Sequence, residues 1–161
     1  MRGSLAAIAV SLATGCTTVT PGSFASEAPA IAAKWPGAVS ITAVHRSDPA
    51  SRFNANGDVS EIDLNAFSDE LARLVRESLA KGGTSTSIGD KTLAVQVIYL
   101  DFLFQGPCLV DYRVELGNGE VFGAQSSGDS ASYTQGCRSA FESAVRQIVS
   151  DARTIAYAGA K

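Results

Sequence analysis

The feature that most constrains the fold is a long run of apolar and β-branched residues, Thr92 to Phe104. It is the strongest strand signal in the chain. Alternate residues of a strand point to opposite faces, so the run divides into two sets. One set is Leu93, Val95, Val97, Tyr99 and Asp101, and the other is Ala94, Gln96, Ile98, Leu100, Phe102 and Phe104.

Other segments are also typical of strands. Residues 38–44 alternate and contain β-branched side chains. Residues 110–116 and 121–124 flank Gly117-Asn118-Gly119, a sequence that predicts a tight hairpin turn. Residues 84–88 are compatible with either a short strand or a turn.

Two segments carry apolar residues at helical spacing. The first is predicted over residues 61–81, with Ser60 and Asp63 as a capped helix start and Gly82-Gly83 as its end. The second is predicted to run without a break from about Tyr133 to Ala156, with small residues that allow close packing on a sheet. The element order predicts an α+β fold in two layers: a mostly antiparallel sheet of about four strands, with two helices packed on one face.

Two segments between these elements are expected to be exposed. Residues 46–60 contain Asp48-Pro49 and Asn56-Gly57, which favour a polar loop or a loose hairpin. Residues 125–132 are rich in serine and glycine. Loops on a rigid scaffold commonly carry recognition, so we expect these loops or the open sheet face to bind a partner.

The N-terminus has the pattern of a secretory signal peptide: Arg2, an apolar run over 5–10, and small residues before Cys16. The segment Leu12-Ala13-Thr14-Gly15-Cys16 resembles the lipobox of bacterial lipoproteins. The resemblance implies cleavage before Cys16 and lipidation of Cys16. Because Thr17 rather than aspartate follows, it also implies the periplasmic side of the outer membrane. The residues leave open an apolar N-terminal helix with an incidental cysteine.

The chain is therefore expected to have three parts: a signal peptide over 1–15, an acylated cysteine with a flexible tether over 16–36, and one α+β domain over 37–161. Residues 17–36 are rich in Ser, Thr, Ala and Pro and show little periodicity. Trp35 is expected to end the tether by docking on the domain. A contact between Trp35 and a partner is the alternative.

If Cys16 is acylated, Cys108 and Cys137 remain as a pair. The periplasm is oxidising, so the pair is expected to form a disulfide that joins the last helix to the sheet. Two unpaired buried thiols are the alternative. No metal or other cofactor is expected, since His45 is the only histidine.

No pattern in the chain points to a reaction. His45 and Asp48 lack the Gly-x-Ser-x-Gly sequence of a hydrolase nucleophile, and His45 is expected to be a surface residue. Residues 52–63 do not fit the EF-hand register, which leaves a solvated loop or a weaker calcium site. Asp101 is compatible with an arginine partner, a sheet edge, a partner-facing position or a general base.

The order of elements over residues 38–158 resembles a group of small Gram-negative lipoproteins. This group includes the YajG-like lipoproteins, the auxiliary lipoproteins of ABC-type lipid transport systems and the N-terminal domain of TolB. The penicillin-binding-protein activator lipoproteins have a similar architecture.

The resemblance implies a non-enzymatic accessory subunit of an envelope assembly or transport system. Its expected partners are the membrane, through the N-terminal lipid, and an envelope protein. A nucleic-acid partner is not expected, because the net charge is −3 and no basic cluster is present. The alternatives are a lipid- or small-ligand-binding periplasmic protein and, less favoured, a small hydrolase or an inhibitor-like domain.

Overall fold

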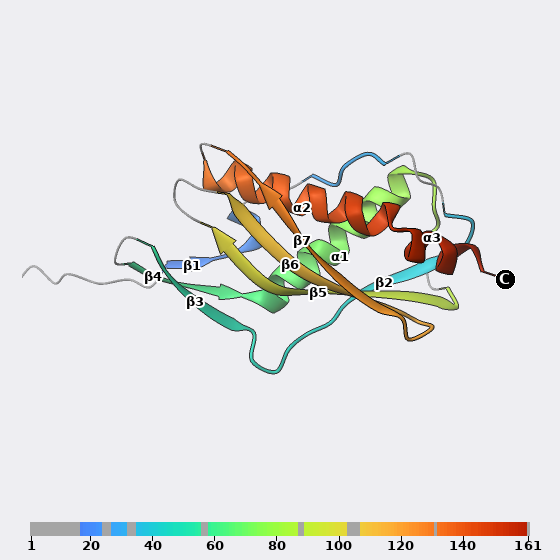
Figure 1. Cartoon of the computed structure of the whole chain (residues 1–161), viewed down its shortest axis with the longest axis horizontal. Helices are drawn as coiled ribbons and strands as arrows, with labels where there is room; N and C mark the ends of the chain where they lie inside the picture. Colours follow the sequence, from blue (N-terminus) through green and yellow to red (C-terminus); the bar gives the residue numbers. More distant parts are fainter. Residues whose placement is uncertain are drawn as a thin grey trace, which may run out of the picture.

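The main sheet has four strands in the order β2-β5-β6-β7 (Figure 1). This computed structural model describes residues 17–23, 27–31, 35–55, 58–86, 89–102, 107–130 and 132–160. The pairs β5–β6 and β6–β7 are antiparallel, and β2 pairs with β5 in parallel. The bounds are β2 Val39–Ala43, β5 Lys91–Phe102, β6 Cys108–Leu116 and β7 Val121–Gly128.

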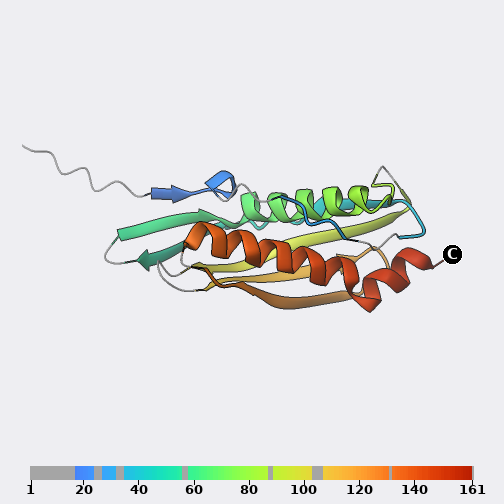
Figure 2. The ribbon, with the colours of Figure 1, turned by 90° about the horizontal axis from the view of Figure 1, so that it is seen from above.

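Two long helices cover one face of this sheet, α1 (Leu64–Lys81) and α2 (Tyr133–Ser150) (Figure 2). The first packs mainly on β5 and β2, and the second on β7 and β6. The helices meet at Phe67 and Phe141, whose ring centroids lie 5.8 Å apart. The prediction of an α+β fold with two helices on one face of a mostly antiparallel sheet is confirmed.

The predicted faces of the long strand hold only for its first half. Leu93, Val95 and Val97 are buried under the helices, but the register shifts between Val97 and Tyr99. A bulge adds one residue, so every later side chain changes face. Leu100 is therefore buried and Tyr99 exposed, the reverse of the predicted sets.

A second sheet lies beside the first, in the order β1-β4-β3. β3 (Ala50–Ala55) and β4 (Asp58–Asp63) form an antiparallel hairpin, so the hairpin alternative for residues 46–60 is the correct one. The strand β4 runs directly into α1, which begins at Leu64 rather than at residue 61. The helix cap is Asp63, not Ser60, because its Oδ1 accepts from the N–H groups of Asn65 (2.9 Å) and Ala66 (3.3 Å).

Residues 16–36 were predicted to form a flexible tether, but most of the described residues among them pack on the domain. β1 (Thr17–Val19) pairs in parallel with β4, and a 3₁₀ turn, η1 (Pro21–Ser23), follows. The carbonyls of Ala28 and Pro29 accept hydrogen bonds from Lys81 Nζ and Ser78 Oγ of α1, both at 2.7 Å. The tether prediction is corrected for these residues, since buried Ala28 and half-buried Ile31 give the segment apolar contacts that its composition concealed.

Trp35 docks on the domain, as predicted. Its side chain is 3% exposed, and its indole N–H donates to the carbonyl of Val149 at 3.3 Å. Its backbone N–H donates to Thr84 Oγ1 at 2.9 Å. Residues 84–86 belong to no strand, so of the two alternatives for 84–88 the strand is wrong for the described part.

The predicted turn joins β6 to β7, with Gly119 in the left-handed region at φ 86°. Beyond it, β7 extends to Gly128 rather than ending at Ala124. Residues 125–128, expected in an exposed loop, are therefore part of the sheet, and Ser126 is buried. The serine and glycine content concealed this half of the strand because neither residue is typical of strands.

The last helix is broken. α2 ends at Ser150 and a short helix, α3 (Ala152–Gly159), follows it. The break occurs at Asp151, whose Oδ1 accepts from the backbone N–H of Arg153 at 2.9 Å and so caps α3. The apolar spacing alone predicted one helix because it continues through this residue. Among the described residues, no helix is long and apolar enough to cross a membrane.

Candidate functional site

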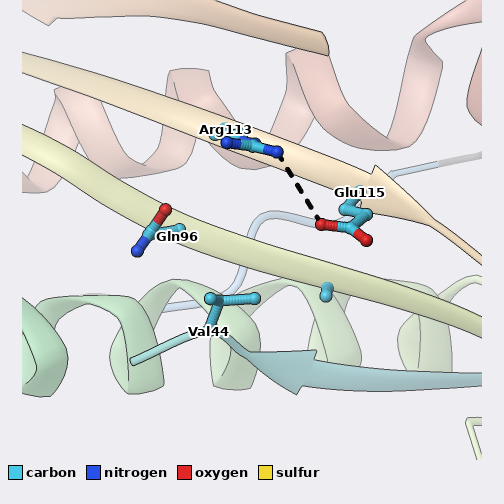
Figure 3. Close-up of a pocket in the computed structure, with 5 residues that line it drawn as sticks. Val44, Gln96, Arg113 and Glu115 are labelled. Atoms are coloured by element: carbon cyan, nitrogen blue, oxygen red, sulfur yellow. Dashed lines mark ion pairs between the residues drawn. The ribbon is translucent and has the colours of Figure 1, made fainter. Parts of the chain in front are cut away.

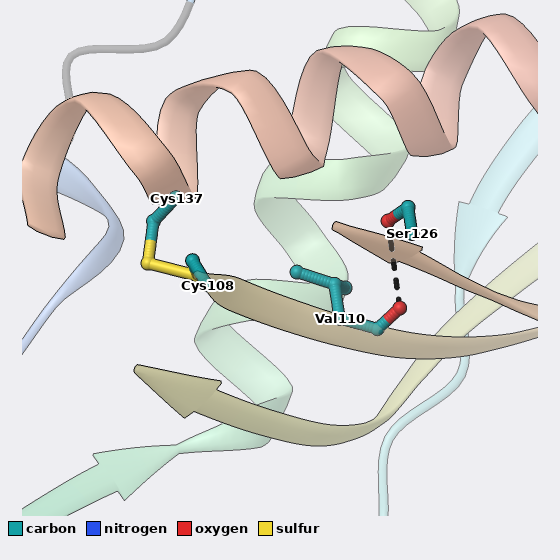
Figure 4. The surroundings of a disulfide bond; sticks show 4 residues. All are labelled: Cys108, Val110, Ser126 and Cys137. Carbon is teal, nitrogen blue, oxygen red and sulfur yellow. Dashed lines mark hydrogen bonds between the residues drawn. A yellow bond between two sulfur atoms is a disulfide. The ribbon is translucent and has the colours of Figure 1, made fainter. Parts of the chain in front are cut away.

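The predicted disulfide between Cys108 and Cys137 is present (Figure 4). Both residues are fully buried, and their Cα atoms lie 4.9 Å apart. The bond joins the start of β6 to the first part of α2, as expected. It closes a loop with a sequence separation of 29, which in the chain-entropy model contributes about 3 kcal/mol to stability. The disulfide is therefore a structural element under the helix layer.

Cys16, the predicted lipidation site, lies outside the described residues. Thr17, the next residue, begins β1. Lipidation of Cys16 stays a prediction.

His45 lies in the connection between β2 and β3, where its Nε2 is 2.9 Å from Asp69 Oδ1 of α1. The two side chains are 54% and 61% exposed, so this pair is in solvent rather than in a cleft. Within the described segments no serine hydroxyl is hydrogen-bonded to His45, and the exposed Asp48 forms no hydrogen bond or ion pair with it. Among the described residues, His45 and Asp48 therefore do not form a catalytic triad with a serine.

No metal site is formed by the part of the chain that the structure describes. There is no group of three or more His, Cys, Asp and Glu side chains close enough together to hold an ion. Of the calcium-loop alternative, Asn56 and Gly57 at the end of the β3–β4 hairpin lie outside the described residues.

The face of the main sheet opposite the helices is open, and it is the face toward the reader in Figure 1. Its rows follow from the strand register. Arg113 of β6 lies between Gln96 of β5 and Gly123 of β7, and Glu115 lies between Ala94 and Val121. The open face thus carries charged, amide and apolar side chains in alternation.

One row of this face brings Tyr99 opposite Asp111, with Asp101 close by on the same strand. The negative charge of Asp101 is the main cause that raises the pKa of the exposed Tyr99 phenol. Asp111 accepts a hydrogen bond from Gln125 Nε2 at 2.7 Å. The row is acidic, and its phenol stays protonated at neutral pH.

The sheet-edge interpretation of Asp101 agrees with the structure. β2 pairs with β5 only between Lys91 and Val95. Among the described strands, Asp101 therefore lies in the half of β5 that pairs with β6 and not with β2.

A shallow depression on the open face is lined by Val44, Ala94, Gln96, Arg113 and Glu115 (Figure 3). The Arg113 guanidinium and the Glu115 carboxylate lie 3.9 Å apart, and both side chains are about half exposed. An exposed ion pair of this kind contributes less than about 1 kcal/mol to stability. Its groups are therefore available to a partner at little cost to the fold.

Large exposed apolar side chains also gather on this face. Of the five in the described segments, Val44, Tyr99 and Val121 lie on the open face and Ile98 at the bulge beside it. Apolar groups set among polar ones are typical of protein interaction sites. Sequence reasoning expected the open sheet face to bind but singled out only Asp101 among its charged residues. The alternating charges Arg113 and Glu115 in a predicted strand were a signal that could have added them.

The open face thus presents exposed apolar, charged and amide side chains that can contact a partner, and the exposed His45–Asp69 pair lies in solvent. Comparison with protein-family models and with curated proteins found no match to this chain.

Proposed function

We propose that this chain is a membrane-anchored periplasmic lipoprotein, and that it acts as a non-enzymatic accessory subunit of an envelope assembly or transport system. The anchor is a lipid on Cys16, on the periplasmic side of the outer membrane. The observation that carries the binding role is the open face of the main sheet. Both long helices lie on the other face, which leaves exposed apolar side chains among charged ones on this face.

The buried disulfide supports this location, because disulfides persist in oxidising compartments and are rare in the cytosol. The outer membrane is supported by the residue after Cys16, which is Thr17 rather than aspartate.

The alternative of a lipid- or small-ligand-binding protein requires an apolar groove between sheet and helices. Where the two helices meet over the sheet, Phe67 and Phe141 are in contact and buried, with exposures of 0% and 1%. The open sheet face is therefore the better-supported binding surface.

The experiment is site-specific photocrosslinking in a Gram-negative host. The photoreactive residue replaces Tyr99 or Val121 on the open face, and Arg146, exposed on α2, in the matched control. We expect one envelope protein to crosslink from both open-face positions and not from Arg146. Crosslinks from Arg146 alone, or from none of the three positions, would contradict the binding role of this face.

The anchor is tested separately by metabolic labelling with an alkyne-bearing fatty acid. We expect label in the wild-type protein and none in the Cys16→Ala variant, together with loss of that variant from the membrane fraction. An unlabelled wild-type protein would contradict the lipid anchor and leave the crosslinking result to be judged alone.

A further inference from the structure

Among the described strands, β7 has a neighbour on one side only, and it lacks the features that usually protect the edge of a sheet. In Figure 2 it forms the lower margin of the sheet. Its eight residues, Val-Phe-Gly-Ala-Gln-Ser-Ser-Gly, include no charge and no proline. Its register with β6 runs without a shift from Val121 to Gly128. Natural edges are blunted by charges, prolines, bulges or short length, so this strand is open to pairing with another chain.

The turn before β7 determines which of its backbone groups point outward. The N–H of Leu116 donates to the carbonyl of Glu120 at 2.9 Å, so these two residues form a hydrogen-bonded pair. Hydrogen-bonded and non-hydrogen-bonded pairs alternate along an antiparallel ladder. Val121, Gly123, Gln125 and Ser127 are therefore in non-hydrogen-bonded positions, and their N–H and C=O groups face away from β6. Within the described chain, none of these groups has a hydrogen-bond partner.

The opposite margin of the sheet is capped. The N–H of Val39 in β2 donates to the carbonyl of Ser85 at 3.2 Å, and Arg76 Nη2 donates to the carbonyl of Ile41 at 2.9 Å. Where β2 ends, Arg46 Nη1 donates to the carbonyl of Ile98 in β5 at 3.1 Å. One margin of the sheet is therefore closed by backbone and side-chain hydrogen bonds, whereas the outward groups of β7 have none within the described chain.

We propose that β7 accepts an extended segment of a partner protein as a fifth strand, through main-chain hydrogen bonds. The charges at its ends favour a particular chemistry. Glu120 and Asp129 flank the uncharged strand and are both exposed. The matching segment is an uncharged strand with basic residues at both ends.

A second copy of this chain is a poorer occupant. In antiparallel pairing of β7 with itself, Glu120 of one copy comes close to Asp129 of the other at each end of the new ladder. Like charges across strands are destabilising. The uncharged centre would tolerate self-pairing, and the flanking carboxylates oppose it.

The test uses a synthetic peptide with lysines at both ends and about eight alternating threonine and valine residues between them. This length matches the strand that can pair along β7. Hydrogen exchange of the whole protein is measured with and without the peptide, and affinity is measured by fluorescence anisotropy. We expect the amides of Gly123, Gln125 and Ser127 to exchange rapidly in the free protein. The peptide is expected to slow them about tenfold or more.

The key variant is Gln125→Pro. Proline is tolerated in edge strands where its missing N–H would face solvent, so this change removes one outward donor and no bond to β6. The control is Gln125→Thr, which loses the same side-chain bond to Asp111 and keeps the N–H. We expect the proline variant to bind the peptide about tenfold more weakly, and the threonine variant within about twofold of wild type.

Three results would overturn the proposal. The first is absence of binding at millimolar peptide. The second is equal binding by the two variants, or protection of amides outside β7. The third is protection of β7 in the free protein together with a dimer mass in analytical ultracentrifugation, which would assign the edge to a second copy. None of these depends on the lipid anchor or on the open sheet face, so failure here leaves the proposed function standing.

Discussion

Tyr112 lies on the helix-covered face of β6, where its hydroxyl donates to Gln147 Oε1 of α2 at 2.8 Å. Burial, helped by the negative charge of Asp151, raises the pKa of Tyr112 to about 12. A free tyrosine titrates at about pH 10. The unfolded chain therefore releases this proton at a lower pH than the folded chain. The contribution of Tyr112 to stability is complete below about pH 10 and is lost as the pH rises through about 12.

We expect the Tyr112→Phe variant to lose less stability than wild type between neutral pH and about pH 11.5, since the phenol that titrates has been removed. The measurement is urea unfolding of both proteins over a series of pH values. The difference at pH 7 reports the lost hydrogen bond to Gln147 and serves as the reference. Parallel curves for the two proteins up to the highest pH would show that Tyr112 does not cause the alkaline loss.

Residue-scale features were predictable where one residue type has few structural roles. The disulfide followed from two cysteines left as a pair in a chain expected to reach an oxidising compartment, and the docking of Trp35 from its place at the end of the expected tether. The bond between Tyr112 and Gln147 was not predictable. It joins residues 35 apart in sequence and depends on how α2 is rotated against the sheet.

At the scale of elements, Ser68 of α1 completes the hydrogen bonding of β5 where β2 ends. The N–H of Val44 donates to the carbonyl of Val95, which places the backbone groups of Val95 on the β2 side of the strand. Val97, two residues on, faces the same side but has no β2 residue to pair with. Instead, Ser68 Oγ accepts from the Val97 N–H at 2.9 Å and donates to the carbonyl of Leu64 at 2.8 Å.

Replacing Ser68 with alanine would leave the buried N–H of Val97 without an acceptor. An unsatisfied buried donor costs about 1–3 kcal/mol, so we expect the free energy of unfolding to fall by that amount. Urea denaturation of Ser68→Ala measures it. The control is Ser150→Ala, because Ser150 makes a similar helix bond to Arg146 but is exposed, and its loss should cost under about 0.5 kcal/mol. Equal stability of the two variants would mean that Val97 finds another acceptor.

Element types followed from apolar periodicity, but several boundaries did not. The bulge in β5 and the cap at Asp151 each interrupt a pattern that continues on both sides. Periodicity reports which positions are apolar, and it is insensitive to one inserted residue or one capped turn when apolar residues follow on either side. The role of Ser68 could not be predicted for a related reason. A serine on the apolar face of a helix does not indicate which backbone N–H of a strand it will bind.

At the scale of the whole molecule, the two-layer fold followed from element order, while the second sheet did not. Its formation requires that β1, near the start of the described chain, pair with β4 about forty residues later. That pairing changes how a lipid anchor would hold the domain. A free tether over residues 17–36 would span about 25 Å on average, whereas β1 fixes Thr17 beside Ser60 of the hairpin.

Cys16 is bonded to Thr17, and consecutive Cα atoms are about 3.8 Å apart, so a lipid on Cys16 would be attached one residue before the start of β1. We therefore expect the lipidated protein to sit with the β3–β4 hairpin end near the membrane and the C-terminal end away from it, as the two ends lie in Figure 1. The measurement is energy transfer from a fluorophore to acceptor-labelled lipid headgroups of vesicles. Transfer should be strong from a fluorophore at Thr20 and weak from one at Ala160, both exposed.

The matched control inserts a flexible Gly-Ser linker of about twenty residues between Cys16 and Thr17, which restores the reach that the docked segment removes. Transfer from Thr20 should then fall toward the value at Ala160. Equal transfer from both positions in the protein without the linker would mean that β1 leaves β4 when the chain is anchored. The prediction of a flexible tether over residues 17–36 would then be correct for the anchored protein. The open face and the edge of β7 both run along the axis between these ends. With the lipid directly before the docked β1, both surfaces would therefore face a neighbouring protein anchored in the same membrane. A long tether would instead favour partners at a distance from the membrane.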